Sequence, residues 1–304
     1  MAVGFSKKNG LTPDRTVIKV ADIGYSITSA DPTMKIQIQG TSKDFINHGV
    51  NPEMTLKAQW RDLSAMKLEG QKLFESNAVW NLFQRNGNYL FSFTSRALGP
   101  VPYKVAQIQK DLTRGEVFLH RPYFNQDKSI YPLAFPLDEL LCIHYLALGR
   151  GAEIHACGVI DSLGKGHMFV GQSGEGKTTM ARLWQNEPAC TVLSDDRIIL
   201  RRIGKELWMY GTPWHGEAGL ASSARAPLTQ IYFLQPSRVN ELVQMDTTEA
   251  MARLISCSFL PFYNPEALEF TLGFFEEVTG VVPCYGLKFF PDKKVVEFIK
   301  NLKD

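Results

Sequence analysis

Residues 167–179 of this 304-residue chain read HMFVGQSGEGKTT, and they decide the fold of its C-terminal half. The apolar run at 167–170 predicts a short buried strand, and the segment 178–184 predicts a helix with one apolar face. Between them, Gly171–Thr178 matches the pattern GxxxxGK(S/T), in which glycines let the backbone turn with its amide hydrogens pointing inward. A strand, a glycine-rich turn and a helix in this order predict a phosphate-binding loop.

The side chains of this loop are suited to a nucleotide. Lys177 places a compact positive charge where the β- and γ-phosphates would lie, and Thr178 offers a hydroxyl to Mg²⁺. The helix that follows adds the positive end of its dipole. We therefore expect nucleotide phosphates and Mg²⁺ to bind here. The expected binding residues are Gly171, Gln172, Ser173, Gly174, Glu175, Gly176, Lys177, Thr178 and Thr179.

Two adjacent acids, Asp195 and Asp196, follow the apolar run Thr191–Leu193 and stand 18 residues beyond Lys177. That separation leaves room for a helix, a turn and a returning strand beside the phosphate-binding strand. One carboxylate can hold Mg²⁺, and the other can orient an attacking hydroxyl and accept its proton. The alternative is a solvated turn or a helix cap, but the nearby phosphate loop favours the catalytic interpretation.

The composition limits the class of protein. Hydrophobic residues make up 44% of the chain and charged residues 21%, which is ordinary for a globular protein and excludes disorder as the main state. The net charge of +2 gives no support to a protein that coats nucleic acid. No apolar run approaches the ~18 residues of a membrane span, and the N-terminal segment has no secretory h-region. We expect neither a nucleic-acid partner nor a membrane.

The cysteines indicate the compartment. There are five, at positions 142, 157, 190, 257 and 284, and no two of them are in a CxxC spacing. An odd number without such a spacing argues against a disulfide framework or a zinc finger. Free thiols fit a reducing compartment, so we expect the cytoplasm.

The chain is expected to form two domains, with a boundary near residues 128–132. Pro132 to Pro136 marks the break, so that 1–130 is a smaller β-rich domain of unknown role and 131–304 is an α/β domain. A helix is expected near Trp60–Phe74. Strands are expected at Thr16–Val20, Tyr25–Thr28, Met34–Gln39, Tyr89–Thr94, Lys104–Lys110 and Glu116–His120.

The C-terminal domain shows both helical and strand patterns. Apolar residues at helical spacing predict a helix from Leu137 to Leu148, and Asp246 with Glu249 forms a capping pair for the next helix. An apolar run predicts a strand at Ile231–Leu234. The remaining helices are expected at Ala250–Ile255, Leu268–Val278 and Val295–Leu302, the second of them ended by Gly280.

The stretch GQSGEGKTTMARLW, followed by LSDDRIIL, resembles the kinase domain of HPr kinase/phosphorylase and its serine-kinase-like relatives. That domain is similar to the nucleotide-binding domain of phosphoenolpyruvate carboxykinase. The resemblance covers roughly residues 130–302, including an upstream strand that carries His155. It implies a P-loop domain built on a mixed sheet, ATP and Mg²⁺ as ligands, and transfer of the γ-phosphoryl group to a hydroxyl.

By position in this family, Asp195 would take the hydroxyl proton, Asp196 would assist or hold metal together with Thr178, and His155 would lie near the phosphates. A hydrogen-bonded core histidine is the alternative for His155. Arg225 stands just before a strand, where a guanidinium can contact the γ-phosphate or simply form a surface ion pair.

The acceptor is where this chain departs from HPr kinases. Their Glu-x-Arg-Gly-like signature is missing, and residues 215–220 read HGEAGL instead. His215 and Glu217 either share one face of a strand or lie in a turn. The missing signature argues against HPr as a necessary substrate. Because some relatives accompany peptide-modification pathways, the resemblance implies a serine of a peptide or protein as the acceptor.

Two other functions remain open. One is a nucleotide-responsive protein that binds ATP and a partner without transfer. The other is a carboxykinase-like enzyme acting on a small acid, which needs a cationic pocket such as Arg201, Arg202 and Arg225 could form. Relatives are often oligomeric, which leaves a homo-oligomer open.

Overall fold

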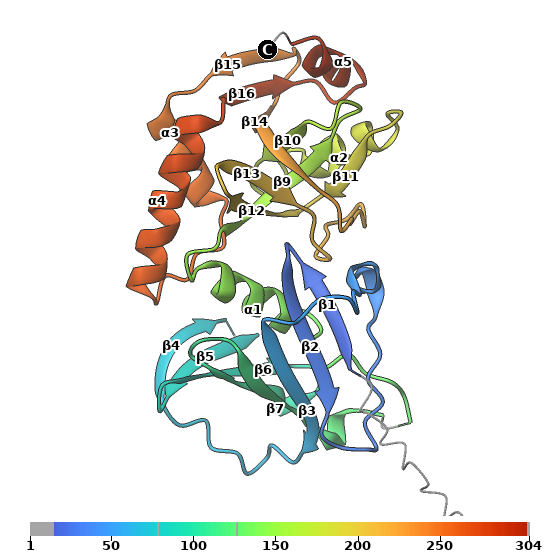
Figure 1. Cartoon of the computed structure of the whole chain (residues 1–304), viewed down its shortest axis with the longest axis vertical. Coiled ribbons are helices and arrows are strands. Elements are labelled where there is room, and N and C mark those ends of the chain that lie inside the picture. Colours follow the sequence, from blue (N-terminus) through green and yellow to red (C-terminus); the bar gives the residue numbers. More distant parts are fainter. Residues whose placement is uncertain (1–14, 78, 126, 303–304) are drawn as a thin grey trace, which may run out of the picture. The chain divides into compact units, whose positions relative to one another are not determined.

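The computed structural model describes residues 15–77, 79–125 and 127–302, and these form two compact units (Figure 1). The N-terminal unit includes residues 24–38 and 47–133, together with the described residues up to 18. The C-terminal unit runs from 134 onward and also takes in residues 19–23 and 39–46. The sequence-based boundary near 130 had assigned these two short segments to the first domain.

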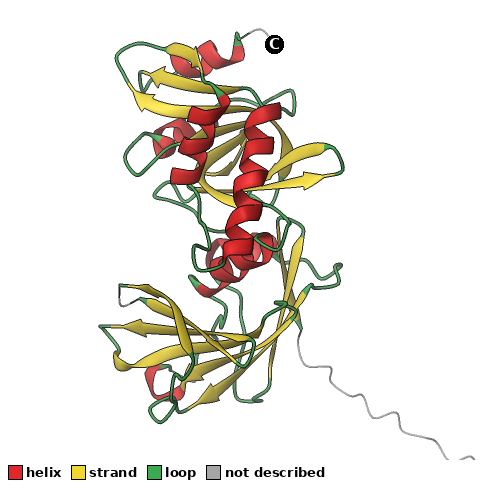
Figure 2. Cartoon of the chain, turned by 90° about the vertical axis from the view of Figure 1, so that its left-hand side faces the viewer, coloured by secondary structure: helices red, strands yellow, loops and turns green. Residues whose placement is uncertain are grey.

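An eight-stranded sheet forms the N-terminal unit (Figure 2). The central strands β2, β3 and β8 are parallel neighbours, and β4 to β8 pair in antiparallel fashion. A short 3₁₀ helix, Arg121–Tyr123, lies outside the sheet, and a second one, Gly40–Phe45, belongs to the C-terminal unit. In spatial order the strands are β1 (Thr16–Val20), β2 (Ile23–Ser29), β3 (Met54–Arg61), β8 (Arg114–His120), β7 (Gly99–Gln109), β6 (Asn88–Ser95), β5 (Trp80–Arg85) and β4 (Gln71–Ser76).

Most of the predicted N-terminal strands are confirmed, but two predictions are wrong. No helix forms at 60–74, because Trp60 belongs to an alternating strand that ends at Arg61 and buries Met54, Leu56 and Ala58. The expected strand at 34–39 makes only a single bridge, from Ile36 to Ile130. Its alternation still predicts burial, since Met34 and Ile38 are both buried.

The C-terminal unit contains a second mixed sheet. Its strand order is β10-β9-β12-β13-β14-β16-β15, and β11 pairs with β9 off this path. Strand β14 also pairs with β10. The strands β10, β9, β12, β13 and β14 therefore form a closed ring, in which each strand pairs with the next and the last pairs with the first. The bounds are β9 (Ala152–Ile160), β10 (Gly166–Val170), β11 (Thr191–Ser194), β12 (Arg197–Ile203), β13 (Glu206–Tyr210), β14 (Arg225–Pro236), β15 (Glu241–Gln244) and β16 (Cys284–Phe289).

The helices of this unit enclose two hydrophobic cores. One core joins the sheet to α3 and α4 through residues such as Leu254 and Phe275, and the other joins it to α2 and α5 through Trp184 and Val296. The expected helices are confirmed, including the Asp246 cap, which accepts from Glu249 N at 2.9 Å. The end expected at Gly280 is wrong, because α4 continues through Gly280 to Val281 and is capped by Val282. Their bounds are α1 (Leu137–Leu146), α2 (Lys177–Gln185), α3 (Thr247–Ser256), α4 (Pro265–Val281) and α5 (Lys294–Lys300).

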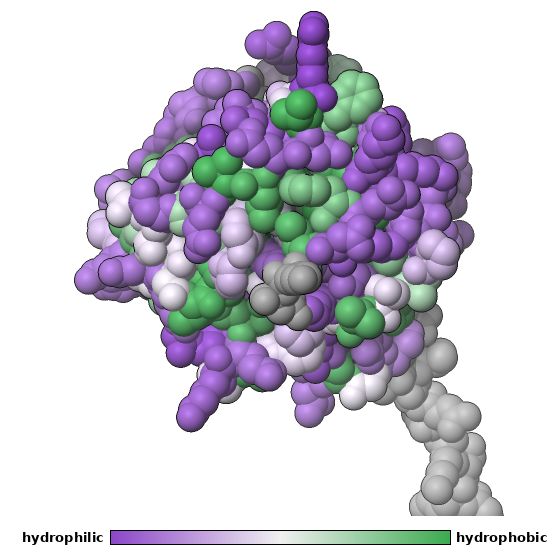
Figure 3. Space-filling view, turned by 90° about the horizontal axis from the view of Figure 1, so that it is seen from above, coloured by the Kyte–Doolittle hydropathy of each residue, from purple (hydrophilic) through white to green (hydrophobic). Residues whose placement is uncertain are grey.

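The surface, the helices and the cysteines also bear on the expectations from composition. On the face seen in Figure 3, hydrophobic residues lie in several separate groups among hydrophilic ones. Of the helices in the described ranges, none combines the length and the apolar character needed to cross a membrane. All five cysteines are free thiols.

Candidate functional site

The glycine-rich loop connects the end of β10 at Val170 to the start of α2 at Lys177. Gly174 and Gly176 have φ angles of 87° and 102°, in the left-handed region that favours glycine. A Cβ at Gly176 would also lie 2.5 Å from the Phe289 ring. This turn therefore requires glycine at position 176 for both backbone and packing reasons.

Lys177 is held inside the loop. Its Nζ donates to the carbonyl oxygens of Gly171 and Gln172 at 2.8 and 2.9 Å, and the residue is only 5% exposed. Burial lowers the pKa of the ammonium from its ordinary value. The positive charge is thus fixed above the turn instead of extending into solvent.

Several loop amides are available to an anion. Within the part of the chain that the structure describes, the backbone N–H groups of Gly176, Lys177 and Thr178 have no acceptor, as is usual for a first helical turn. The Gln172 amide differs, because it donates to the Glu175 Oε2 at 2.5 Å. One corner of the anion site is therefore occupied by a carboxylate of the loop itself.

Asp195 is an internal anchor. Its carboxylate is fully buried, with Oδ1 accepting from Gly216 N at 3.0 Å and Oδ2 accepting from Ala218 N at 2.8 Å. A Cβ at Gly216 would lie 2.9 Å from Asp195 Oδ2, so the loop packs directly on the acid. The expectation that Asp195 faces a substrate hydroxyl needs correction, because both of its oxygens already hold the loop at 215–219.

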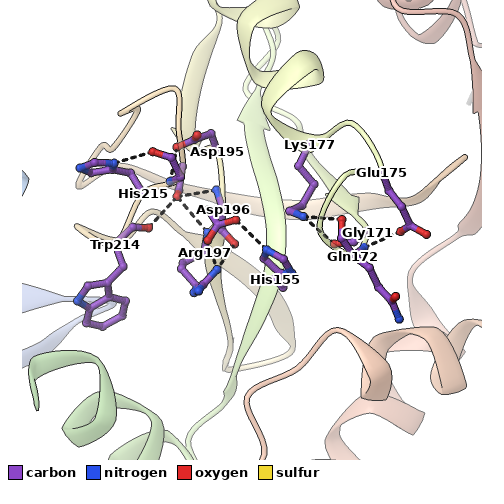
Figure 4. Close-up of polar contacts among 12 residues, drawn as sticks. His155, Gly171, Gln172, Glu175, Lys177, Asp195, Asp196, Arg197, Trp214 and His215 are labelled. Atoms are coloured by element: carbon purple, nitrogen blue, oxygen red, sulfur yellow. Dashed lines mark hydrogen bonds and ion pairs between the residues drawn. The ribbon is translucent and has the colours of Figure 1, made fainter. Parts of the chain in front are cut away.

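Asp196 is the more accessible acid, with 22% of its side chain exposed. Its Oδ1 accepts from His155 Nε2 at 2.7 Å, and Oδ2 accepts from Arg197 (Figure 4). Burial, together with the charges of Lys177 and Arg197, lowers the pKa of His155 to about 4. At neutral pH the imidazole is therefore uncharged, and its Nε2–H donates to Asp196.

Ser194 holds the backbone at Asp196 and Arg197, and the sequence interpretation missed it. Its buried hydroxyl accepts from Asp196 N at 3.2 Å and from Arg197 N at 3.1 Å, and it donates to Trp214 O at 3.2 Å. A serine directly before a pair of acids at a strand end is a typical side-chain-to-backbone turn. This pattern could have identified Ser194 from the sequence.

Strand β9 brings the loop and the acids together. Val170, the last residue of β10, pairs with Ala156, and Arg197 pairs with His155 on the opposite edge of β9. Neighbouring strands are about 4.8 Å apart, so β10 and β12 lie roughly 10 Å apart on either side of β9. In Figure 4, His155 lies between Asp196 and the loop that carries Lys177.

Three other candidates lie in different surroundings. His215 and Glu217 are exposed in the loop after β13, so the turn alternative holds. Arg225 donates to the Asp22 carboxylate and to Tyr210 Oη at 3.1 Å, and its guanidinium lies over the Trp208 ring. The structure therefore engages Arg225 in a surface ion pair and does not bring it to the loop.

The arginines of the carboxykinase alternative are engaged as well. Arg201 donates to the carbonyl oxygens of Arg150 and Ala21, and Arg202 pairs with Glu277. Arg201 and Arg202 line one pocket together with Arg150, but Glu266, Glu269 and Glu277 line it as well, and Arg225 is not among its lining residues.

Comparison with known proteins finds similarity in structure but not in sequence. No family model matches the chain, and no curated protein matches it. A solved structure, the HPr(Ser) kinase/phosphatase from Coxiella burnetii, aligns at 10% identity over 49% of this chain and 90% of that chain, with a TM-score of 0.29. This similarity is weak and shows nothing of the function.

Proposed function

We propose that the C-terminal unit binds ATP with Mg²⁺ and transfers the γ-phosphoryl group to a hydroxyl, that of a serine in a peptide or protein. The observation that carries this proposal is the arrangement around β9. The glycine-rich loop adjoins one edge of that strand, and the acidic pair adjoins the other, with His155 between them. Phosphoryl transfer depends mainly on positioning and charge neutralisation, which this arrangement can supply.

The loop would hold the phosphates. The amides of Gly176, Lys177 and Thr178 are free to donate to phosphate oxygens, and the start of α2 adds its dipole. On binding, the Lys177 ammonium would exchange the two loop carbonyls for phosphate oxygens. That exchange is favourable, because a buried ammonium gains more from an anion than from neutral carbonyls.

The residues present fit a Mg²⁺ ion that comes with the nucleotide. Among the described residues, no group of three or more His, Cys, Asp or Glu side chains could hold a metal alone. Mg²⁺ is commonly bound by one or two protein oxygens, with phosphates and waters completing its shell. The Thr178 hydroxyl and the Asp196 carboxylate would hold the ion, which would supply charge neutralisation at the phosphates.

Asp196 would act on the acceptor. The attacking hydroxyl oxygen forms a bond to the γ-phosphorus, the bond to the β–γ bridging oxygen breaks, and the hydroxyl proton passes to the Asp196 carboxylate. The neutral His155 would hold that carboxylate through its Nε2–H donor. Asp195 would keep the loop at 215–219 in place beside the acceptor. This proposal differs from the expectation from the sequence, in which Asp195 took the proton and Asp196 assisted.

Labelled ATP tests the proposal. The chain is incubated with γ-labelled ATP, Mg²⁺ and a lysate from its source, and transferred label is identified by gel and mass spectrometry. We expect label on a peptide or protein, and its loss with Lys177→Ala and with Asp196→Asn. Tight Mg-ATP binding with no labelled acceptor would contradict transfer.

That last result would instead support a nucleotide-responsive binding protein, the second candidate. The observation that favours it is that both oxygens of Asp195 are already taken by backbone amides, which leaves a single accessible carboxylate in the pair. In this case ATP would order the loops at the site and change the affinity for a partner.

A further inference from the structure

Arg197 begins β12 and directly follows Asp196. The antiparallel register of β9 and β12 puts Arg197 opposite His155 and puts Ile199 opposite Glu153. Residues two apart on a strand share a face, and directly opposed residues lie on the same face. The side chains of Glu153, His155 and Arg197 therefore project from one face of the sheet.

The Arg197 guanidinium joins three carboxyl groups. One nitrogen, Nη1, donates to the Asp196 carboxylate and, at 3.3 Å, to the Asp196 carbonyl oxygen. The Nε donates to Glu139 Oε1 at 2.9 Å and lies 3.7 Å from Glu153 Oε1. Glu139 belongs to α1 and Glu153 to β9, so one side chain links a helix, a strand and the acidic turn.

Phe259 covers this cluster. The Arg197 Cζ lies 4.5 Å from the centroid of the Phe259 ring, and the His155 ring meets the same phenyl edge-on at 6.4 Å. The segment that carries Phe259 is tied to β9, since Phe259 N donates to Glu153 O at 3.2 Å. An apolar ring over the charged groups excludes water and strengthens the electrostatic interactions beneath it.

Acidic side chains surround the Arg197 guanidinium. Burial and the neighbouring Glu139 raise the pKa of Glu153 well above its ordinary value, which favours the protonated form of that acid. Glu139 and Asp196 both accept hydrogen bonds from Arg197. Without the guanidinium, two partly enclosed carboxylates would lose their shared counter-ion and repel each other.

We infer that Arg197 and Glu139 are positioning residues of the proposed transfer site: the guanidinium holds the Asp196 carboxylate against His155, and Glu139 on α1 holds the guanidinium. The task of Asp196 rests on the proposed function, whereas the place where Asp196 is held rests on these contacts alone. Position 197 requires arginine for this task. The Nε–H and Nη1–H groups of a guanidinium donate in fixed directions to two different acids, and the single ammonium of a lysine cannot do so.

Turnover kinetics provide the first test. Glu139→Gln and Arg197→Gln should lower kcat for phosphoryl transfer about 10- to 100-fold with little change in KM for ATP, as losses of supporting hydrogen bonds usually do. Arg197→Lys should remain impaired. Glu153→Gln should keep wild-type kcat, because Glu153 Oε1 lies 3.7 Å from Arg197 Nε, beyond hydrogen-bond distance.

The matched control lies on the same strand. Arg202→Gln breaks the exposed pair with Glu277 and should change neither kcat nor KM. Wild-type kcat in both Glu139→Gln and Arg197→Gln would overturn the inference.

A second test reads the position of Asp196 without turnover. The chain has six histidines, so ¹⁵N-histidine labelling gives few side-chain signals, and His155→Gln assigns the one of interest. Glu139→Gln and Arg197→Gln should shift the His155 signals, and Arg202→Gln should not. Unshifted His155 signals in both variants would overturn the inference, whatever their kcat. A wild-type chain that binds no Mg-ATP would overturn the proposed function, but it would not affect the conclusion that Arg197 and Glu139 position Asp196.

Discussion

The Oδ2 of Asp195 accepts a hydrogen bond from the backbone N–H of Ala218 at 2.8 Å, while its Oδ1 accepts from Gly216 N. Asp195→Asn would turn one acceptor into an amide donor that faces another donor. We expect this variant to lose about 1–3 kcal/mol of unfolding free energy, the usual cost of an unsatisfied buried group. Urea titration of the folded chain measures it.

Asp196→Asn is the informative partner of that variant. Asp196 is partly exposed, so its amide analogue should unfold at nearly the wild-type urea concentration while phosphoryl transfer is lost. If Asp195→Asn proved fully stable and Asp196→Asn fully active, the division of roles between the two acids would be refuted.

Glu175 competes with phosphate for the loop. Its carboxylate accepts from the Gln172 amide at 2.5 Å, next to the site proposed for an anion. Removing a charged hydrogen-bond partner and a like charge should raise the affinity for Mg-ATP about 10-fold in Glu175→Ala. Calorimetry measures the change, and Glu276→Gln on the exposed side of α4 is the control, expected to bind as the wild type does.

A weaker or unchanged affinity in Glu175→Ala would mean that the Glu175 carboxylate supports the binding conformation of the loop and does not obstruct it.

Ser194→Ala removes three hydrogen bonds at the acidic turn. Two backbone donors would lose this partner, and the Trp214 carbonyl would keep only the Thr212 hydroxyl, so we expect a loss of about 1–3 kcal/mol in stability and reduced transfer. Ser223→Ala, at an exposed position in the next loop, should alter neither. Equal behaviour of the two variants in thermal unfolding and in transfer would contradict the positioning role of Ser194.

The pH dependence of stability should report His144. This side chain is buried in α1, where Nδ1 donates to Leu140 O at 2.6 Å and Nε2 accepts from Tyr263 Oη, an arrangement that requires the neutral imidazole. Burial lowers the pKa of His144 to about 4, below the value of 6.5 in the unfolded chain. The unfolded state therefore takes up a proton first as the pH falls.

The free energy of unfolding should consequently decrease by about 1.4 kcal/mol per pH unit for this one group between pH 6.5 and 4, and the contribution is fully present above pH 6.5. Urea titrations at several pH values measure this slope. In His144→Gln the slope should shrink by that amount, whereas in His48→Gln, at an exposed position, it should not. The same slope in all three chains would contradict the assignment.

Most of the fold of the C-terminal unit could be predicted from patterns within short sequence segments. The strand at 166–170, the loop and the helix at 177–185 are encoded within one short segment, so no distant contact was needed to predict them. The helix expected at 60–74 failed because a period-two burial pattern across Met54–Trp60 was not recognised.

The roles of site residues were less predictable, because they depend on long-range contacts. The amides that hold Asp195 come from Gly216 and Ala218, more than 20 residues away, and no local pattern indicates them. The partner of Arg197 on α1 is 58 residues distant. Arg225 was expected near the phosphates, but its partner Asp22 lies at the other end of the sequence.

Calorimetric titration of Mg-ATP into the wild-type chain and into Lys177→Ala tests the central claim most directly. The buried ammonium and the free amides of the loop predict saturable binding with one nucleotide per chain, and a large loss of affinity when Lys177 is removed. A wild-type chain that shows no saturable binding, or a Lys177→Ala variant that binds equally well, would contradict the account.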